Sequence, residues 1–327
     1  MNVLSLFDGM SCGQIALNRL GIKYKNYYAS EIDKYPIQVA QANYPDTIQL
    51  GPIEFITKEM FGENKIDLII GGSPCQGFSL AGKQLNFKDP RSLLFFEFAR
   101  LVKELNPKYF LLENVKMKKD YQDIITDYIG VEPIEINSAL VSAQNRKRLY
   151  WTNIPKIGNL KDKKLVVADI LELEIDKKYY LSKKAVDYMS RLRNDKQRWE
   201  YHKNPLNGKA SCLTANMYKG VPYGVVRYPS SFRVASLEVN GHDYLKRVYS
   251  FAGKSPTLAS ITGGGHHAKI FDHDTETARK LTPTECELLQ TIPKGYTKGV
   301  SDTQRYKMLG NGWTVDVICH ILKNITL

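Results

Sequence analysis

Ile66-Asp67-Leu68-Ile69-Ile70-Gly71-Gly72-Ser73-Pro74-Cys75-Gln76-Gly77 is an apolar run that leads directly into a loop of glycine, serine and proline. An apolar run bounded by turn residues predicts a buried strand. Cys75 would follow the carboxyl end of that strand, where α/β folds place their ligands and their chemistry. A cysteine in this position is either a nucleophile, because the thiolate is the reactive form, or a small buried side chain.

The segments around this run alternate between strand and helix patterns. Strands are expected at residues 2–7, 27–30, 66–70 and 109–112, and helices at 15–20, 36–43 and 92–105. The alternation predicts an α/β fold, with a doubly wound, mostly parallel sheet and helices on both faces. Thr282-Pro283-Thr284-Glu285 has the form of a helix start with proline at the first helical position, so an ordered helical segment is expected near the end of the chain.

The net charge of +12 is concentrated in the middle of the chain. Residues 156–270 hold 21 Lys and Arg against 10 Asp and Glu, and the rest of the chain holds 25 against 24. A field concentrated in this way favours a polyanionic partner, most simply a nucleic acid, over a merely solvated basic face. The strand–helix alternation also ends there, which predicts two domains: residues 1–157 plus 277–327, and a smaller irregular domain at 158–276.

The composition argues against several classes of protein. No stretch has the length of a membrane span, and no secretory leader is recognisable. The five cysteines are scattered and form no Cys-x-x-Cys pair, which argues against a disulfide framework and against a zinc site. A cytoplasmic protein without a bound metal and without a membrane partner is expected.

Four further features carry candidate chemistry. Asp8-Gly9-Met10-Ser11-Cys12-Gly13 is a glycine turn after the first strand, and Glu31 at the end of the second strand could accept hydrogen bonds from two ribose hydroxyls. Together they favour a cofactor that contains a nucleoside. Glu113 ends another strand and is a candidate acid/base partner of Cys75. Arg146 and Arg148 share one face if extended and could hold a phosphate or a carbonyl oxygen.

Taken in order, these pieces resemble the DNA cytosine-5 methyltransferases. The sequence motifs of the first domain also resemble the catalytic domain of the animal de novo enzymes. The segments after Cys75 and Thr257 resemble bacterial restriction–modification enzymes. The resemblance spans almost the whole chain and leaves only the variable recognition region unmatched. The matching pieces are Phe7-Asp8-Gly9, Glu31, Ser73-Pro74-Cys75-Gln76, Glu113-Asn114-Val115, Gln144-x-Arg146-x-Arg148, Arg279-Lys280-Leu281-Thr282-Pro283-x-Glu285 and Gly310-Asn311.

The resemblance implies a class I, Rossmann-like methyltransferase that uses S-adenosylmethionine, leaves S-adenosylhomocysteine, and flips a cytosine out of double-stranded DNA. Cys75 would attack C6 of the base, and Glu113 would act at N3. Arg146 and Arg148 would steady the base and its flanking backbone, with Arg148 at the cytosine O2. The smaller domain would recognise the target sequence. A bacterial or phage enzyme is expected, monomeric on DNA, with a cognate restriction endonuclease as a further partner.

The same resemblance implies two sets of binding residues. The cofactor pocket is expected from Phe7, Asp8, Gly9, Met10, Glu31, Ile32, Ile53, Pro74, Leu94 and Asn311. DNA contacts are expected from Ser79, Lys83, Gln84, Thr257, Leu258, Gly263 and Gly264.

The chain departs from the family pattern at Pro52, where the family has an aspartate that contacts the adenine amino group. A second departure is Ser11-Cys12, where bacterial members often have glycines. Neither departure removes a residue that is expected to take part in the reaction. Two alternatives stay open: a catalytically inactive nucleic-acid-binding relative, and an RNA cytosine-5 methyltransferase.

Overall fold

The structure, a computed structural model, describes residues 1–74, 90–172, 174–180, 182, 184, 203–204, 209–210, 212–215, 217, 225–227, 233–236, 247–249 and 278–326. The chain divides into two compact units: Met1–Leu165 with Cys212–Tyr218 and Pro283–Leu327, and Val166–Ser211 with Lys219–Thr282. The predicted division differs from this one mainly at Cys212–Tyr218. This segment belongs to the first unit, where the backbone of Leu213 is hydrogen-bonded to Gln144 and Arg146.

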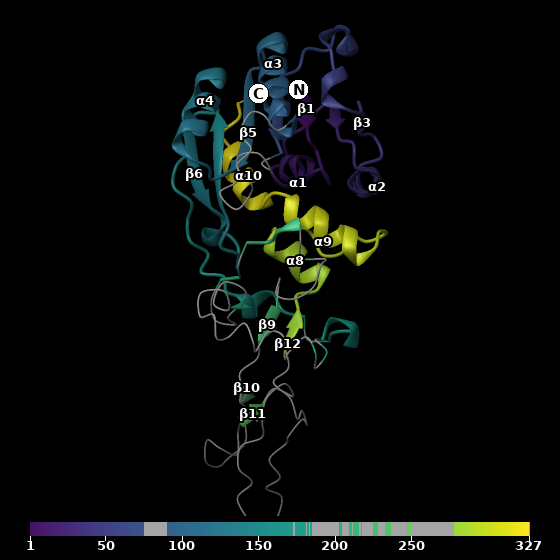
Figure 1. Ribbon diagram of the computed structural model, residues 1–327, viewed down its shortest axis with the longest axis vertical. Helices are drawn as coiled ribbons and strands as arrows, with labels where there is room; N and C mark the ends of the chain where they lie inside the picture. The colour runs from purple at the N-terminus through teal and green to yellow at the C-terminus, as the bar shows by residue number, and fades with distance from the viewer. Residues whose placement is uncertain are drawn as a thin grey trace, which may run out of the picture. The chain divides into compact units, whose positions relative to one another are not determined.

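The first unit is built on a seven-stranded sheet in the order β3-β2-β1-β4-β5-β7-β6 (Figure 1). Strands β1 to β5 run parallel, whereas β7 is antiparallel to both of its neighbours, β5 and β6. The predicted mostly parallel sheet is therefore confirmed. The strands are β1 (Asn2–Leu6), β2 (Asn26–Ser30), β3 (Ile48–Gln49), β4 (Leu68–Gly72), β5 (Tyr109–Val115), β6 (Pro133–Asn137) and β7 (Lys147–Thr152).

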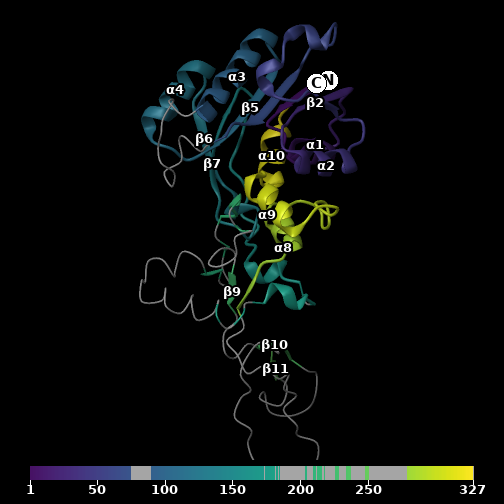
Figure 2. The same ribbon diagram turned by 45° about the vertical axis from the view of Figure 1, so that its right-hand side comes forward.

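Helices cover both faces of this sheet. Helices α3 and α4 lie on one face, and α1, α2 and α10 lie on the other (Figure 2). The helices are α1 (Cys12–Arg19), α2 (Lys34–Asn43), α3 (Pro90–Leu105), α4 (Lys119–Ile129), α8 (Pro283–Leu289), α9 (Asp302–Asn311) and α10 (Val315–Leu322). Both faces of the sheet are thus buried, as in doubly wound folds.

Strand β4 shows why its sequence is a continuous apolar run. Leu68, Ile69 and Ile70 are all fully buried, because side chains on both faces of this central strand meet helices. The run ends at Gly71, where an added Cβ would lie 2.9 Å from the carbonyl oxygen of Leu6 and 3.0 Å from the Phe98 ring. Glycine there lets α3 pack closely against the sheet.

The last part of the first unit is helical, as predicted. Helix α8 begins at Pro283, the proline that the sequence places at the first helical position. Gly310 and Asn311 are the last residues of α9. The reason is that the backbone amide of Gly312 still donates to the carbonyl of Met308, which extends the helix to that point.

The second unit contains two small sheets among the described residues. One has the order β12-β9-β8, and in the other β10 pairs antiparallel with β11. The strands are β8 (Lys203–Asn204), β9 (Val225–Arg227), β10 (Arg233–Ser236), β11 (Arg247–Tyr249) and β12 (Ala278–Lys280). No helix in the described part of the chain is both long and apolar enough to span a membrane.

Candidate active site

A cavity of about 840 Å³ lies in the first unit, where strands β1, β2, β4 and β5 end. This volume is in the range of small-molecule sites in proteins. The cavity lies at the carboxyl end of β4, where the sequence predicted a ligand site. Its walls include the predicted residues Phe7, Asp8, Gly9, Met10, Glu31, Ile32, Ile53, Pro74, Leu94, Asn311, Glu113, Arg146 and Arg148, and also Cys212–Ala215 and Trp313.

One end of the cavity is organised by Glu31. Its Oε2 accepts from the backbone amide of Gly9 at 2.9 Å, and its Oε1 accepts from the amides of Ile32 and Asp33 at 2.7 and 2.9 Å. The carboxylate is thereby fixed between the turn after β1 and the turn after β2. Since each carboxylate oxygen accepts more than one hydrogen bond, acceptor capacity remains for a ligand.

The turn after β1 is strained on both sides of Gly9. Phe7 and Ser11 have left-handed backbone conformations, with φ of 56° and 66°. Such conformations are rare for side chains larger than glycine and gather at ligand sites. The sequence pattern predicted that this turn contacts a ligand. The left-handed conformations of Phe7 and Ser11 agree with that prediction.

Asp8 brings a buried carboxyl group to the same turn. Tyr27 donates a hydrogen bond to its Oδ1 at 2.9 Å, whereas its Oδ2 is buried and has no hydrogen-bond partner. Burial raises the pKa of Asp8 to about 6, and the nearby Glu31 carboxylate adds to the rise. The protonated form of Asp8 is therefore favoured far more than in water.

Apolar side chains form the walls beside Glu31. Ile32 and Phe55 line the cavity although they are 76% and 73% exposed, and Ile53 is buried beneath. Pro52 also lines the cavity, and its side chain offers no hydrogen-bond acceptor. Exposed apolar side chains at a cavity rim are explained most simply by a flat, apolar ligand surface that covers them.

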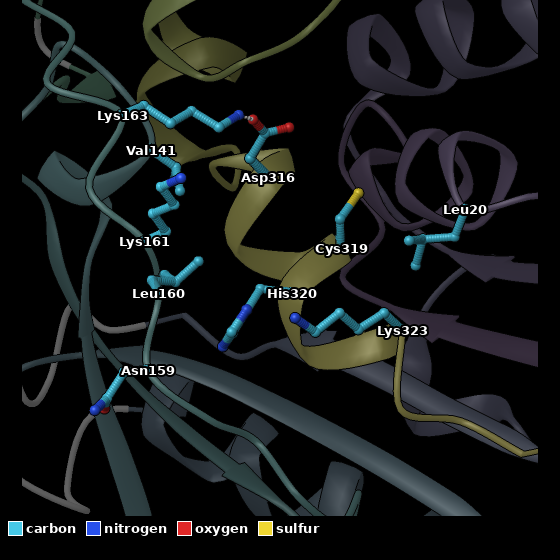
Figure 3. A pocket seen from close by; sticks show the side chains of 10 residues that line it. All are labelled: Leu20, Val141, Asn159, Leu160, Lys161, Lys163, Asp316, Cys319, His320 and Lys323. Atoms are coloured by element: carbon cyan, nitrogen blue, oxygen red, sulfur yellow. Dashed lines mark hydrogen bonds and ion pairs between the residues drawn. The ribbon is translucent and has the colours of Figure 1, made fainter.

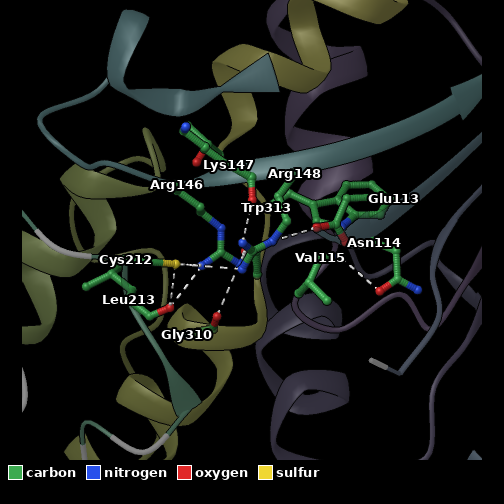
Figure 4. Close-up of polar contacts among 12 residues, drawn as sticks. Glu113, Asn114, Val115, Arg146, Lys147, Arg148, Cys212, Leu213, Gly310 and Trp313 are labelled. Atoms are coloured by element: carbon green, nitrogen blue, oxygen red, sulfur yellow. Dashed lines mark hydrogen bonds and ion pairs between the residues drawn. The ribbon is translucent and has the colours of Figure 1, made fainter. Parts of the chain in front are cut away.

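The other end of the cavity is organised by Glu113 (Figure 4). Its Oε1 lies 3.0 Å from Nε of Arg148, and its Oε2 accepts from the indole Nε1 of Trp313 at 3.1 Å. Burial by itself lowers the pKa of Arg148, but the Glu113 carboxylate, Cys212 and Tyr150 together outweigh it and raise that pKa above its usual value. The Arg148 guanidinium group therefore keeps its positive charge at neutral pH.

Two neighbouring residues connect Glu113 to the described residues that precede Cys75. Gly72 pairs with Glu113 across β4 and β5, and an added Cβ there would lie 2.9 Å from both Glu113 Oε2 and Trp313 Nε1. Asn114 donates from its side-chain amide to Oγ of Ser73 at 3.0 Å. Ser73 stands two residues before Cys75, so adjacent residues of β5 provide the Glu113 carboxyl group and hold the described segment that leads to Cys75.

Arg146 is almost completely buried, and protein acceptors surround its guanidinium group (Figure 4). Nη1 donates to the carbonyl of Leu213 at 2.9 Å, and Nη2 donates to those of Gly310 and Gly312 at 3.2 and 2.9 Å. An added Cβ at Gly310 would lie 2.2 Å from the backbone of Thr214, so the two segments are in close contact. Arg146 therefore joins three separate parts of the chain.

Cys212 places a second thiol in the cavity. Its Sγ lies 3.2 Å from Nη1 of Arg146 and 3.7 Å from Nη2 of Arg148. Burial raises the pKa of the Cys212 thiol, but the two guanidinium groups outweigh that effect and lower it below the usual value. Burial instead raises the pKa of Cys12, in the same cavity, to about 12. The two thiols thus differ in their tendency to ionise.

Part of the predicted site lies outside the described residues. This holds for the nucleophile Cys75 and for all the predicted DNA contacts, namely Ser79, Lys83, Gln84, Thr257, Leu258, Gly263 and Gly264. The roles assigned to these residues stay predictions.

A second, smaller cavity of about 400 Å³ lies beside α10 (Figure 3). Three of its polar side chains have partners within the protein: Lys163 pairs with Asp316 at 2.6 Å, and the Nε2 of His320 lies 2.7 Å from the carbonyl of Gly158. It contains none of the predicted site residues. Of these two cavities, only the larger is lined by residues that the sequence predicted for the site.

A model of the family described as "C-5 cytosine-specific DNA methylase" matches residues 1–129 and 133–327 of the chain. The chain belongs to this family. The DNA methylase is 31% identical over 337 residues to the type II methyltransferase M1.ScrFI of Lactococcus lactis subsp. cremoris, covering 97% of this chain and 75% of the relative. It is 29% identical to the type II methyltransferase M.HpaII of Haemophilus parainfluenzae, covering 96% and 86%. The enzyme is thus a DNA (cytosine-5) methyltransferase, and the family resemblance in the sequence is confirmed.

Solved structures agree on the fold of the DNA methylase. The Entamoeba histolytica methyltransferase EhMeth superposes with a TM-score of 0.71 at 15% identity, covering 99% of this chain and 97% of that one. The S. pombe Dnmt2 methyltransferase superposes with a TM-score of 0.64 at 16% identity, covering 98% of this chain and 97% of that one. At these identities the likeness concerns the fold alone, and it confirms the Rossmann-like methyltransferase class.

The sequence analysis did not single out three residues that organise the Glu113 end of the cavity. Asn114 belongs to the Glu113-Asn114-Val115 motif, and Trp313 follows Gly310-Asn311 by two positions. An amide or indole side chain at such positions most often has only a structural role. Cys212 stood in Gly208-Lys209-Ala210-Ser211-Cys212-Leu213, which resembles Gly253-Lys254-Ser255-Pro256-Thr257-Leu258. That weak repeat was the one signal in the sequence that marked the Cys212 segment.

Proposed function

We propose that the enzyme transfers the methyl group of S-adenosylmethionine to C5 of a cytosine in a specific double-stranded DNA sequence, through base flipping and covalent catalysis by Cys75. The observation that carries this proposal is the grouping at the ends of β4 and β5. Glu113 is fixed there by Arg148 and Trp313, and Asn114 anchors Ser73 at the start of the Cys75 loop.

The other end of the cavity fits the cofactor. Glu31 has remaining acceptor capacity for the ribose hydroxyls, and Ile32 and Phe55 offer apolar surface for the adenine. Pro52 provides no side-chain acceptor for the adenine amino group, so recognition there would rely on the ribose and the apolar walls. When bound, S-adenosylmethionine supplies an electrophilic methyl group.

In the proposed methyl transfer each residue has a separate role. The Cys75 thiolate adds to C6 of the flipped cytosine while Glu113 holds a proton at N3, so that the electron density reaches C5. After C5 has taken the methyl group, loss of the C5 proton and departure of the Cys75 sulfur restore the ring. Arg148 orients Glu113 and can reach the base, whereas Arg146, with its guanidinium surrounded by protein acceptors, organises the segments around them.

The second unit is proposed to recognise the target sequence. The basic residues 156–270 supply the field that attracts duplex DNA, and the loops that face the bases are expected within Asn216–Tyr228 and Ser260–Lys269, most of which lies outside the described residues. We expect a monomer on DNA, with a cognate endonuclease as a further partner.

The test is transfer of labelled methyl groups to mixed-sequence duplex DNA and RNA, followed by base-resolution mapping of 5-methylcytosine. Methylation of DNA at one short recurring motif supports the proposal. Cys75→Ser should abolish transfer and leave salt-sensitive DNA binding in place. Full activity of Cys75→Ser would refute the covalent mechanism, and methylation confined to RNA would refute the DNA assignment.

A further inference from the structure

The sulfur of Cys212 lies between the two arginines of the active site. Arg148 has one partner for each nitrogen: Nε pairs with Glu113, Nη1 donates to the carbonyl of Lys147, and Nη2 lies 3.7 Å from the sulfur. The same sulfur is 3.2 Å from Nη1 of Arg146. Among the described residues, Cys212 is therefore the side chain that links the buried arginine to the arginine that pairs with Glu113.

Sulfur suits this position for an electrostatic reason. Two guanidinium groups that share one partner repel each other, and an acceptor with anionic character between them offsets that repulsion. The described charged groups around the sulfur are Arg146, Arg148 and, beyond Arg148, Glu113. The two positive charges lower the pKa of Cys212 in spite of burial, whereas burial raises the pKa of Cys319, on α10, to about 11.

The backbone of Cys212 and its neighbour is held independently of the sulfur. The amide of Leu213 donates to Oε1 of Gln144 at 2.7 Å, and its carbonyl accepts from Arg146. The position of Sγ is thereby fixed by contacts that a substitution of the Cys212 side chain leaves in place. The sulfur can be changed without releasing the segment that carries it.

We propose that Cys212 is a positioning residue for methyl transfer, whose sulfur accepts hydrogen bonds from Arg146 and Arg148 and so holds Arg148 in the orientation that pairs with Glu113. This rests on the proposed function, because the orientation of Glu113 matters only if Glu113 acts on the base. Cys212 itself touches no reacting atom in this scheme.

The decisive comparison is between Cys212→Val and Cys212→Ser. Valine fills a similar volume without an acceptor, whereas serine keeps an acceptor. We expect Cys212→Val to lower kcat by about tenfold or more, as for the loss of a hydrogen bond to a charged group, with KM for S-adenosylmethionine roughly unchanged. Cys212→Ser should recover most of that loss. Cys319→Ala, a buried cysteine outside the cavity, is the matched control and should keep wild-type kcat.

Two kinetic outcomes overturn the proposal. If Cys212→Val keeps wild-type kcat, the sulfur positions nothing. If serine is impaired as strongly as valine while both variants unfold at the wild-type temperature, the sulfur acts in some way other than as an acceptor. Thermal unfolding of each variant identifies a loss that comes from misfolding, and kcat is then compared per folded molecule.

A second measurement does not depend on methyl transfer. The rate of alkylation of Cys212 by iodoacetamide, followed by peptide mass spectrometry, rises with pH as the thiol ionises. In Arg148→Met the midpoint pH of this rise should move upward, whereas the plateau rate reports accessibility. An unchanged midpoint overturns the contact. If the wild type transfers no methyl group, the proposed function fails while this midpoint still tests the arrangement of Cys212 and Arg148.

Discussion

The two carboxylates of the large cavity are held in opposite ways. Glu31 is fixed by backbone amides of Gly9, Ile32 and Asp33, from two turns at most 22 positions away. Glu113 is fixed by side chains, one of which, Trp313, comes from 200 positions along the chain. The backbone amides that bind Glu31 are in place once the local strand–turn–helix units have formed. The side chains that bind Glu113 come into contact with it only when distant segments have packed.

This contrast has a functional meaning. A carboxylate held by backbone amides keeps its position when nearby side chains change, which suits a group that only binds. A carboxylate held by Arg148 and Trp313 can exchange partners when a base enters, which suits a group that handles a proton. Substitutions at the two ends should therefore affect different steps of the reaction.

The largest effect is expected for Glu113→Gln. The amide keeps the shape of the side chain but has no negative charge and cannot hold the proton at N3, so kcat should fall by about 10³-fold. The dissociation constant of S-adenosylmethionine should stay roughly unchanged. Single-turnover methyl transfer and a cofactor titration measure the two quantities. Equal loss of both would show that the two ends of the cavity are not separate.

The converse is expected for Glu31→Ala. Loss of the acceptor for the ribose hydroxyls should raise the dissociation constant of S-adenosylmethionine by about 10 to 100-fold, the usual cost of hydrogen bonds to a charged group. DNA binding, measured by titration without cofactor, should change little. If cofactor and DNA binding weaken equally, Glu31 supports the fold of this end and has no specific role in cofactor binding.

Gly310→Ala tests the long-range packing at the Glu113 end. The added methyl group would meet the backbone of Thr214 and Ala215 at 2.2 and 2.3 Å, and backbone cannot move aside cheaply. We expect a loss of about 2 kcal/mol in the free energy of unfolding, together with lower kcat. Denaturant titration measures the first. Gly158→Ala is the control, because an added Cβ there has nothing within 4 Å, and an equal loss in both variants would contradict the packing argument.

The smallest effect is expected for Asp8→Asn and depends on pH. Burial raises the pKa of Asp8 in the folded protein to about 6 from an ordinary value of 3.8. The stability that the protonated carboxyl contributes is thus present below about pH 4 and lost as the pH rises through about 6. Asparagine has no charge to bury, so the variant should gain about 1 kcal/mol over the wild type at pH 8, part of the gain being offset by an unpaired amide nitrogen.

Thermal unfolding without cofactor, between pH 4 and pH 8, measures this difference. The gap between Asp8→Asn and the wild type should narrow as the pH falls from 6 to 4. A gap that is constant with pH would mean that the carboxyl does not titrate in this window. A gap that widens toward low pH would contradict the sign of the pKa shift.

The strand–helix alternation and the residues at the strand ends could be read from the sequence. The apolar run before Cys75 predicted a buried strand, and Glu31 and Glu113 were recognised because each was expected at the end of a strand. These features depend on the local pattern of apolar residues and on turn chemistry, which a short stretch of chain contains completely. Ordered motifs then indicated the family.

The tertiary structure alone decided which contacts hold the Glu113 end of the cavity together. Arg146 and Arg148 stand in one motif of the sequence, yet one is buried against Leu213, Gly310 and Gly312 while the other pairs with Glu113. Cys212 stood in a region predicted to belong to the second domain, and the fold places its sulfur between these two arginines. The physical reason is that such contacts join residues far apart in the chain, and their partners are selected by packing and by burial of charge, which no local pattern records.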